Sequence, residues 1–598
     1  MDSNDRFLNP YNFVRYLDEG KNDKTESKLL GKCRPPPHDR FLSLNGRIEC
    51  KLEAVTPIFI SDSEFVESKP VKGGEHKFYR FFKLRKENGK EKFAIPSTSL
   101  RGMLRSVFEA ATDSCFSVFE GDKRLSHREI KKARIMKPSI VLSLPDNNSC
   151  GEVDICNSAR VPFNLLKGDW GCGDVAYAII DKRRNPKVTK ISEKSLNNGT
   201  KGWLKITGQN IPGKKNEYFF YPTGKKVKFS KEPMEDYNKV LSEQIENEFS
   251  TKFQNSELSV GDLIYVEVTN NEVVNIALVK IPRLLYRNSI RNLLLPSHLS
   301  PCSKYNNLCP ACRVFGWVNQ NSPKDLKKKV AYAGRVKISH AEPIRDISDE
   351  ETLEVTLAIL SSPKPTATFF YLLKNGEPDS NVNYDTDGAQ LRGRKFYRHQ
   401  EKPNAQEYQR VGDDPKNHLN RTIIDALKPG AEFKFTIEFE NLAPVELGAL
   451  LWSIEMENKM CHKLGLAKPL GFGSVKLSID EISVLDVKKR YNSLTDEGWK
   501  KVTDQKMKWV NLFKEVMSDK YEKSFKELNN IKDLKAISSP SILPVHYPRM
   551  DKKPDEKGEN FKWFAQKIPL EIASKDTGLA YNFINKKEKM EKKVLRNF

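Results

Sequence analysis

Apolar residues recur with helical spacing between positions 100 and 111, and this is the clearest pattern in the chain. Arg101 and Arg105 lie four residues apart on the other face of the predicted helix, and Ser97 and Ser99 offer hydroxyls at its start. Free N–H groups, hydroxyls and guanidinium groups at a helix start suit a phosphate. An ordinary amphipathic helix with solvated arginines is the alternative. The apolar positions are Leu100, Met103, Leu104, Val107, Phe108 and Ala111.

Alternating apolar and polar residues predict strands around this helix, at 48–54, 333–341, 433–439 and 475–479, and a second helix follows Pro444. The order is therefore strand, helix, strand, strand, helix, strand. This is the order of the ferredoxin-like or RNA-recognition-motif fold. The sequence predicts an α+β protein with such a palm, long β-rich insertions and a helical C-terminal extension.

The spacing of these patterns divides the chain into eight segments. They are an N-terminal arm (1–40), the first part of the palm (41–116), an inserted, mostly β region (117–287), a cysteine-rich knuckle (288–320), a palm strand (321–360), a second insertion (361–429), the second half of the palm (430–486) and the extension (487–598).

Composition narrows the classes of partner. The 598 residues carry a formal net charge of +22, which favours a polyanion such as nucleic acid. No apolar run reaches the length of a membrane span, and no signal peptide is visible, so we expect a cytoplasmic protein without a membrane partner. Ten cysteines in such a chain indicate thiols or metal ligands rather than a disulfide framework.

His298, Cys302, Cys309 and Cys312 form the pattern H-x3-C-x6-C-x2-C. A Cys-x2-Cys knuckle presents two thiolates to one metal, and a third cysteine with a histidine completes a tetrahedral set. Four protein ligands leave no open position, so this spacing predicts a structural zinc. A redox pair or free thiols are the alternatives.

Two further segments combine basic residues with features that suit RNA. The turn that contains Gly471, Gly473 and Ser474 brings backbone amides and Lys468 together, which favours a phosphate over a plain tight turn. Arg392, Arg394 and Lys395 are interleaved with aromatic residues, as in single-strand binding sites, although a charged hairpin has the same composition.

A catalytic centre is harder to find. Asp62 and Glu64 follow the first strand, where an acid can face bound RNA, whereas His340 and His462 are isolated in the sequence. A lone histidine is more often structural than a general base.

Several motifs, in this order, resemble those of the RAMP superfamily of CRISPR-associated proteins, and especially its large members from type III systems of the D kind. Coverage runs nearly from end to end. The main motifs are Ile95-Pro-Ser-Thr-Ser-Leu-Arg-Gly-Met-Leu-Arg105, Cys309-Pro-Ala-Cys-Arg-Val-Phe-Gly316, Ala333-Gly-Arg-Val-Lys-Ile-Ser-His-Ala341 and Leu470-Gly-Phe-Gly-Ser-Val-Lys476; supporting ones include Asn9-Pro-Tyr-Asn-Phe-Val14, Leu391-Arg-Gly-Arg-Lys-Phe-Tyr397 and Glu446-Leu-Gly-Ala-Leu-Leu-Trp452.

The resemblance implies a backbone subunit that binds guide RNA and recognises a complementary target RNA. Ser97, Ser99, Arg101, Arg105 and the turn at 471–474 would contact guide phosphates, and 392–398 would belong to a thumb. The partners implied are a polymerase-like large subunit, small helical subunits and other RAMP subunits.

The same resemblance bears on catalysis. Target-cleaving members carry an aspartate, usually in a Gly-rich context, in the loop between the first strand and the first helix. There this chain offers Asp62 and otherwise Glu64 and Glu67, and Gly73-Gly74 is followed by Glu75 rather than by aspartate. Target cleavage with Mg²⁺ or Mn²⁺ and a binding-only role are therefore both open. The alternative function is a metal-independent endoribonuclease that processes repeat RNA through His340 or His462.

Overall fold

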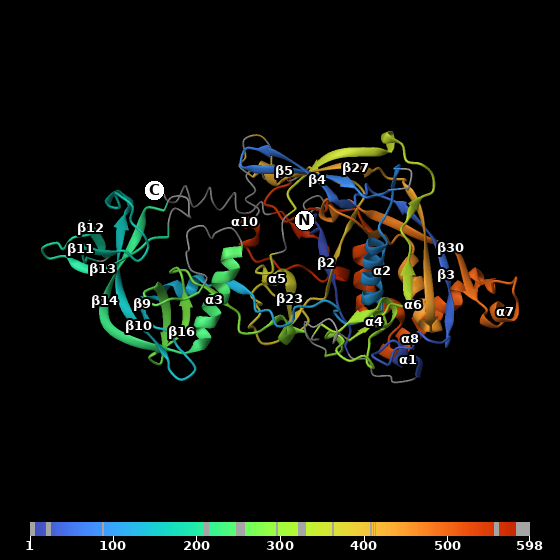
Figure 1. Ribbon diagram of the computed structural model, residues 1–598, viewed down its shortest axis with the longest axis horizontal. Helices are drawn as coiled ribbons and strands as arrows, with labels where there is room; N and C mark the ends of the chain where they lie inside the picture. The colour runs from blue at the N-terminus through green and yellow to red at the C-terminus, as the bar shows by residue number, and fades with distance from the viewer. Residues whose placement is uncertain are drawn as a thin grey trace. The chain divides into compact units, whose positions relative to one another are not determined.

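The computed structural model forms two compact units. The main unit comprises Met1–Asp122 and Ile290–Phe598, and the inserted unit is Lys123–Ser289, which overlaps the predicted insertion 117–287 (Figure 1). The mixture of strands and helices confirms the α+β class. The residues described are 6–581 without 19–24, 86–88, 184, 208–213, 247–256, 295–296, 321–329, 361–363, 407–408, 411, 413, 415 and 555–560.

An antiparallel sheet forms the centre of the main unit, with strands in the order β20-β28-β3-β30-β29. Along the chain, β3, α2, β20, β28, α6 and β30 follow one another in the order that the sequence predicts. These elements are β3 (Leu44–Ala54), α2 (Ser97–Ala111), β20 (Val336–Ile338), β28 (Glu432–Leu442), α6 (Pro444–Glu455), β29 (His462–Lys463) and β30 (Ser474–Leu485).

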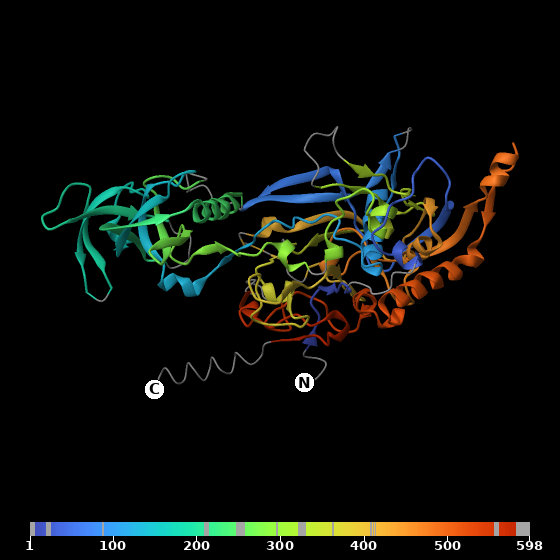
Figure 2. The ribbon, with the colours of Figure 1, turned by 90° about the horizontal axis from the view of Figure 1, so that it is seen from below.

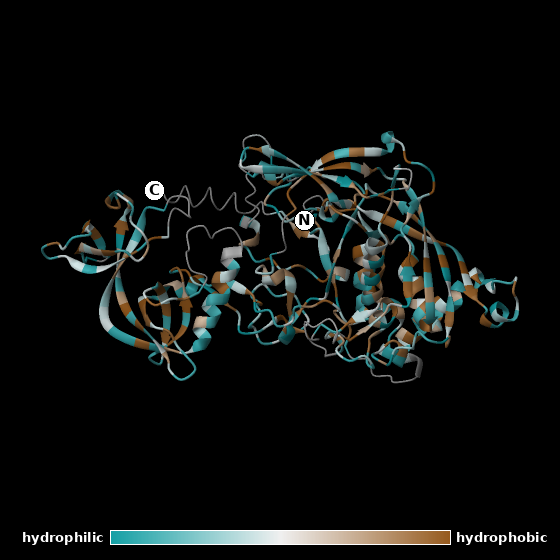
Figure 3. Cartoon of the chain, viewed as in Figure 1, coloured by the Kyte–Doolittle hydropathy of each residue, from teal (hydrophilic) through white to brown (hydrophobic). Residues whose placement is uncertain are grey.

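Alternating side chains explain the core of this sheet. In β28 the four residues Phe433, Phe435, Ile437 and Phe439 are buried, while the polar residues between them are not. Figure 3 shows hydrophobic and hydrophilic residues alternating along the strands of the main unit. α2 and α6 contact each other, and α6 also packs on β28 and β30. All the apolar positions predicted for α2 are buried.

The second palm strand is shorter than the predicted 333–341. β20 covers only Val336–Ile338. At Ser339 the side-chain hydroxyl, rather than a backbone carbonyl, accepts the hydrogen bond from the Thr436 amide, so the regular strand pairing ends there. The segment predicted as an N-terminal arm contains strands that pair with distant parts of the chain. Its residues form β1 (Arg6–Phe7) and the buried strand β2 (Tyr11–Val14), which pair with β33 (Leu579–Ala580) and β25 (Arg394–Tyr397).

The rest of the main unit comprises a second sheet and the C-terminal helices. The sheet has the order β22-β27-β5-β4, with β4 (Ser61–Val71), β5 (Gly74–Phe81), β22 (Thr352–Leu357) and β27 (Arg421–Leu427). The helices α8 (Lys506–Tyr521) and α9 (Asn529–Ser538) are seen in orange and red in Figure 2. α8 packs closely on α6, since a Cβ on Gly448 would lie 2.0 Å from the Trp509 carbonyl oxygen.

The inserted unit is a closed barrel with the strand order β10-β12-β11-β13-β14-β16-β15-β9. β10 and β14 also pair with each other along their whole lengths, so they divide the barrel into two rings that share these strands. The elements are β9 (Lys137–Ser143), β10 (Gly151–Pro162), β11 (Val175–Asp181), β12 (Lys187–Ser192), β13 (Thr200–Lys205), β14 (Asn216–Phe229), α3 (Lys231–Glu246), β15 (Leu263–Thr269) and β16 (Glu272–Ala277).

Each ring encloses its own apolar core. The ring of β9, β10, β14, β15 and β16 is filled by residues such as Val153, Ile264 and, from α3, Leu241. In this ring β9 pairs with β10 and with β15, and β14 is parallel to β16. The helix α3 lies between β14 and β15 along the chain. This is the arrangement of an OB-fold. The other ring, of β10–β14, is filled by residues such as Ala176 and Leu204.

Candidate functional site

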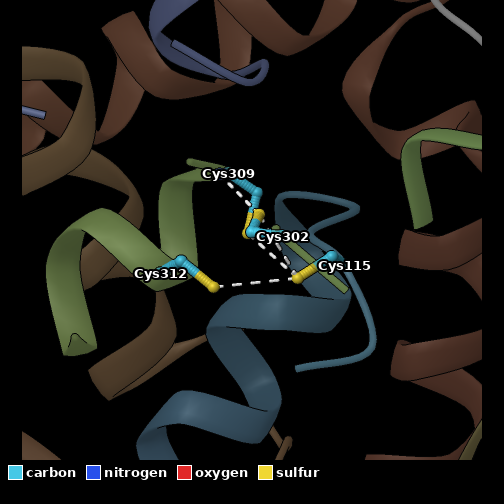
Figure 4. A group of neighbouring side chains, drawn as sticks. All are labelled: Cys115, Cys302, Cys309 and Cys312. Carbon is cyan, nitrogen blue, oxygen red and sulfur yellow. Dashed lines mark hydrogen bonds between the residues drawn. The ribbon is translucent and has the colours of Figure 1, made fainter. Parts of the chain in front are cut away.

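Four buried cysteines meet at the end of α2 (Figure 4). Cys115 follows α2, Cys302 comes from a loop, and Cys309 and Cys312 lie at the start of α4 (Pro310–Phe315). The Cys115 Sγ atom is 3.7 Å from Cys302 Sγ, 3.5 Å from Cys309 Sγ and 3.7 Å from Cys312 Sγ, and all four sulfur atoms lie within 4.8 Å of one another.

These distances fit one tetrahedral metal ion. With Zn–S bonds of about 2.3 Å, the sulfur atoms of a tetrahedral site with four cysteine ligands are separated by about 3.8 Å. Contacts among the sulfur atoms raise the pKa of Cys115 and of Cys312 and lower the pKa of Cys302 and of Cys309, so a bound cation would be needed to hold all four as thiolates. The cluster can therefore hold a metal such as zinc, with no ligand position left open for water.

Two N–H donors contact the sulfur atoms of the cluster. The Cys309 amide lies 3.2 Å from Cys302 Sγ, and Arg105 Nη2 lies 3.9 Å from Cys312 Sγ. Four thiolates around a divalent ion would carry a net negative charge, which the Arg105 guanidinium would offset. Such second contacts orient the ligands and favour the thiolate form.

Cys115 occupies the place that the sequence pattern gave to His298. His298 Nε2 instead lies 2.8 Å from Asp113 Oδ2, so the imidazole contacts a carboxylate beside the cluster. Cys115 is 187 residues from Cys302, with the inserted unit between them. Motif spacing cannot connect ligands that are separated by a whole folded unit.

The two arginines of α2 have partners inside the chain. Arg101 Nη1 donates to the Val336 carbonyl at 2.8 Å, and Nη2 donates to the Phe315 carbonyl. Arg105 donates to Glu109 at 2.8 Å and to the Gly316 carbonyl at 3.2 Å. These contacts join α2 to the helix α4 and its C-terminal end, so both guanidinium groups have partners inside the chain, and their contact with guide phosphates stays a prediction.

The first turn of α2 keeps its polar groups toward the surface. Pro96 is the N-cap, and no side chain caps the helix, so the hydroxyls of Ser97 and Ser99 are not used as caps. Both residues are partly exposed and Thr98 is exposed. The Ser97 amide donates to His340 Nδ1 at 3.2 Å. A neutral His340 then carries its proton on Nε2, as a further donor beside the helix start.

The glycine turn predicted to approach RNA is buried. Gly471 and Gly473 have positive φ angles, and a Cβ on Gly473 would lie 1.8 Å from the Leu464 carbonyl oxygen, so glycine is required for packing. Lys463 Nζ donates to the carbonyls of Gly471 and Phe472 and to Ser474 Oγ, and burial lowers its pKa to about 7. Burial also lowers the pKa of Lys468. Lys463 therefore holds the turn, and phosphate binding by Lys468, Gly471, Gly473 and Ser474 stays a prediction.

The basic and aromatic segment at 392–398 packs on other segments of the chain, with Arg392 and Arg398 buried and the residues between them partly exposed. Arg392 is 2% exposed and donates to the Phe369, Leu372 and Glu571 carbonyls. Arg394 pairs with Glu109 and lies over the Phe116 ring. Lys395 Nζ lies 4.0 Å from the centre of the Tyr11 ring, and burial lowers its pKa to about 8. The interleaving of cations and rings supports packing between distant segments.

Asp62 lies at the start of β4, where pairing with β5 shifts between Ser61 and Val66. Its Oδ1 accepts the Glu64 amide at 3.0 Å, and the residue is partly exposed. No group of carboxylates that could hold a metal includes Asp62 among the described residues.

Residues 51–476 match the family model of the RAMP superfamily. The chain belongs to the RAMP superfamily. It is also similar to Csc2 of Thermofilum pendens, known from a crystal structure, with 11% identity and a TM-score of 0.24, over 87% of this chain and 90% of that one. No curated protein matches the chain. Within the part described, no helix has the length and apolar character of a membrane span.

The matched part of this RAMP protein includes all four cysteines and a buried ionic cluster next to them. Glu446, in α6, is 2% exposed and accepts from Arg313 Nε at 3.0 Å and Arg335 Nη2 at 2.8 Å. Arg313 directly follows Cys312 in α4, and Arg335 directly precedes β20. The Glu446 carboxylate therefore joins α4 to the central sheet. Burial alone would raise the pKa of Glu446, but Arg335 and Arg313 outweigh it and hold the pKa below its usual value.

Proposed function

We propose that this RAMP protein is a guide RNA-binding backbone subunit of a type III CRISPR interference ribonucleoprotein that recognises target RNA. The match to the RAMP superfamily over residues 51–476 carries the proposal, and the net charge of +22 supports it. The main sheet with α2 and α6 would be the palm, and 361–429 the thumb. We place the protein in the cytoplasm with a structural zinc, beside a polymerase-like large subunit, small helical subunits and other RAMP subunits.

The exposed first turn of α2 is the part of the predicted RNA site that the geometry supports. Ser97, Thr98 and Ser99 surround the positive end of the helix dipole, and His340 adds a donor at the same place. Hydroxyls and N–H groups at a helix start bind phosphate oxygens without reading the base. This suits a guide whose sequence varies.

Purification with and without the neighbouring CRISPR subunits tests the proposal. RNA extracted from the purified particle should be protected repeat-spacer RNA when sequenced. If no RNA is bound and the chain cuts free repeat RNA, the endoribonuclease is the correct function instead.

Thr98→Glu should separate RNA binding from folding. A carboxylate at the helix start repels phosphate, so we expect RNA binding to weaken about tenfold or more. It also interacts favourably with the helix dipole, by about 0.3–1 kcal/mol, so thermal stability should not fall. Fluorescence anisotropy with repeat RNA, beside a melting curve, measures both.

Thr98→Gln is the matched control, because it has the same size as the glutamate without the charge. It should bind RNA within a few-fold of the wild type. Equal binding by Thr98→Glu and the wild type would remove the start of α2 from the interface.

We propose that metal-dependent cleavage of target RNA, if Mg²⁺ or Mn²⁺ supports it, depends on Asp62. Asp62→Ala should then stop cleavage of a labelled target while guide binding persists, because the residue lies outside the α2 turn. Glu64→Ala is a neighbouring control. Unchanged cleavage by Asp62→Ala would exclude this carboxylate.

The metal-independent endoribonuclease rests on a different residue. His462 is 2% exposed, and burial lowers its pKa to about 4, so it does not suit proton transfer to RNA. His340 is exposed beside Ser97 and is the histidine that this alternative requires. His340→Gln should abolish cleavage of repeat RNA without metal if the alternative is correct.

A further inference from the structure

One face of the inserted unit combines exposed lysines with a partly exposed aromatic ring. β12, β11 and β13 are neighbours in the barrel, and Figure 1 shows them together at one end of this unit. Tyr177 on β11 lies directly opposite Ser192 on β12 and Lys201 on β13. Ile179 lies opposite Lys190. Residues directly opposite in a ladder share a face, so these side chains form one outer surface.

The neighbouring positions confirm which way this surface faces. Ala176 and Ala178 alternate with Tyr177 along β11, and both are buried in the core of the ring. Tyr177 and Ile179 are therefore directed away from that core and are partly exposed, while Lys190 and Lys201 are exposed. An apolar centre between cationic side chains results.

The charges on this face are not neutralised internally. Among the described residues, no carboxylate forms an ion pair with Lys187, Lys190 or Lys201. Asp181 lies directly opposite Lys187 in the ladder and pairs with Arg183. The outer face of the other ring differs. There, Glu152 and Asp154 on β10 lie opposite Lys228 and Lys226 on β14, and Lys226 pairs with Glu152 at 3.2 Å. Acidic and basic groups cancel on that face.

We propose that the outer face of β12, β11 and β13 is a second RNA site, which binds a single strand. A base can stack on Tyr177 while adjacent phosphates pair with Lys190 and Lys201, which is how single strands are held without sequence preference. The partly exposed ring of Tyr177 suits unstacked bases rather than a duplex, whose bases are hidden. A five-stranded ring with OB-fold order in the same unit is a scaffold that supports such binding elsewhere.

This site is separate from the one proposed at α2. It belongs to the inserted unit, and the α2 turn belongs to the main unit. The inference therefore does not depend on the proposed role as a guide-binding subunit, and variants of one site leave the other unchanged.

Binding of a fluorescein-labelled oligouridine of about 16 nucleotides to the full chain tests the proposal, because this length covers the largest single-strand sites of one domain. Tyr177→Ala should weaken binding about tenfold, whereas Tyr177→Phe retains the ring and should bind like the wild type. Lys190→Ala with Lys201→Ala should lower the slope of log affinity against log salt by about 1.4, or about 0.7 for each lost phosphate contact.

Lys225→Ala with Lys228→Ala is the control, because it removes two exposed lysines from β14 in the same unit. The affinity of this control for oligouridine should stay nearly unchanged, and so should the sites of ultraviolet crosslinking. Ultraviolet crosslinking with mass spectrometry should place the oligouridine on β11–β13. Three outcomes would each overturn the proposal. They are crosslinks only in the main unit, an equal loss of oligouridine affinity in the control variant, and capture of an acidic protein in place of RNA.

Discussion

Cys115→Ser should release the metal from the purified protein. Serine is a poor zinc ligand, and three remaining thiolates cannot close a tetrahedral site. We expect metal content to fall from about one ion per chain to a small fraction of that, measured by inductively coupled plasma mass spectrometry. Stability should fall as well. An ion whose free concentration is about a thousand times its Kd stabilises the folded state by about 4 kcal/mol. A chelator should lower the melting temperature of the wild type in the same way.

Two variants control this experiment. Cys50→Ser makes the same change at a buried cysteine in β3 that lies outside the cluster, and it should keep its metal. His298→Gln removes the ligand that sequence spacing suggested, and it should also keep its metal because Cys115 holds that place. Full metal content in Cys115→Ser together with loss in His298→Gln would contradict the assignment of four cysteine ligands.

The local pattern of the chain was enough to predict the framework of the main unit. Leu100, Leu104 and Phe108 are buried on one face of α2, and Phe433 and Ile437 are buried in β28, because periodicity reports directly on which face meets a core. Cys302, Cys309 and Cys312 come together because they lie within one short segment. These features depend on neighbours in sequence, which a single sequence displays.

The observed contacts of the basic residues depend on distant neighbours, which the sequence does not display. The acceptors of Arg101 lie more than 200 residues along the chain, and those of Arg392 include a carbonyl at position 571. A guanidinium group near several unpaired carbonyls satisfies buried acceptors that would otherwise cost free energy. The same residue types therefore serve RNA binding or internal packing, and only the fold distinguishes the two.

Glu446→Gln should destabilise the main unit more than any surface substitution. The change leaves the buried guanidinium groups of Arg313 and Arg335 without a counter-charge, which costs about 3–5 kcal/mol in comparable buried pairs. Differential scanning calorimetry measures the loss. Because Arg313 follows Cys312, metal release to a chelator should also be faster in this variant.

The effect of Glu446→Gln should depend on pH in a defined direction. The pKa of Glu446 is lower in the folded protein than in the unfolded chain, where it is about 4.3. Its contribution is therefore fully present above that value and is lost as the pH falls through the folded pKa. The stability difference from the wild type should stay constant between about pH 7 and 5 and shrink below about pH 4. Glu440→Gln, which breaks an exposed pair with Lys337, is the matched control and should cost at most about 1 kcal/mol. An equal loss in both variants would show that the buried carboxylate does not join α4 to the central sheet.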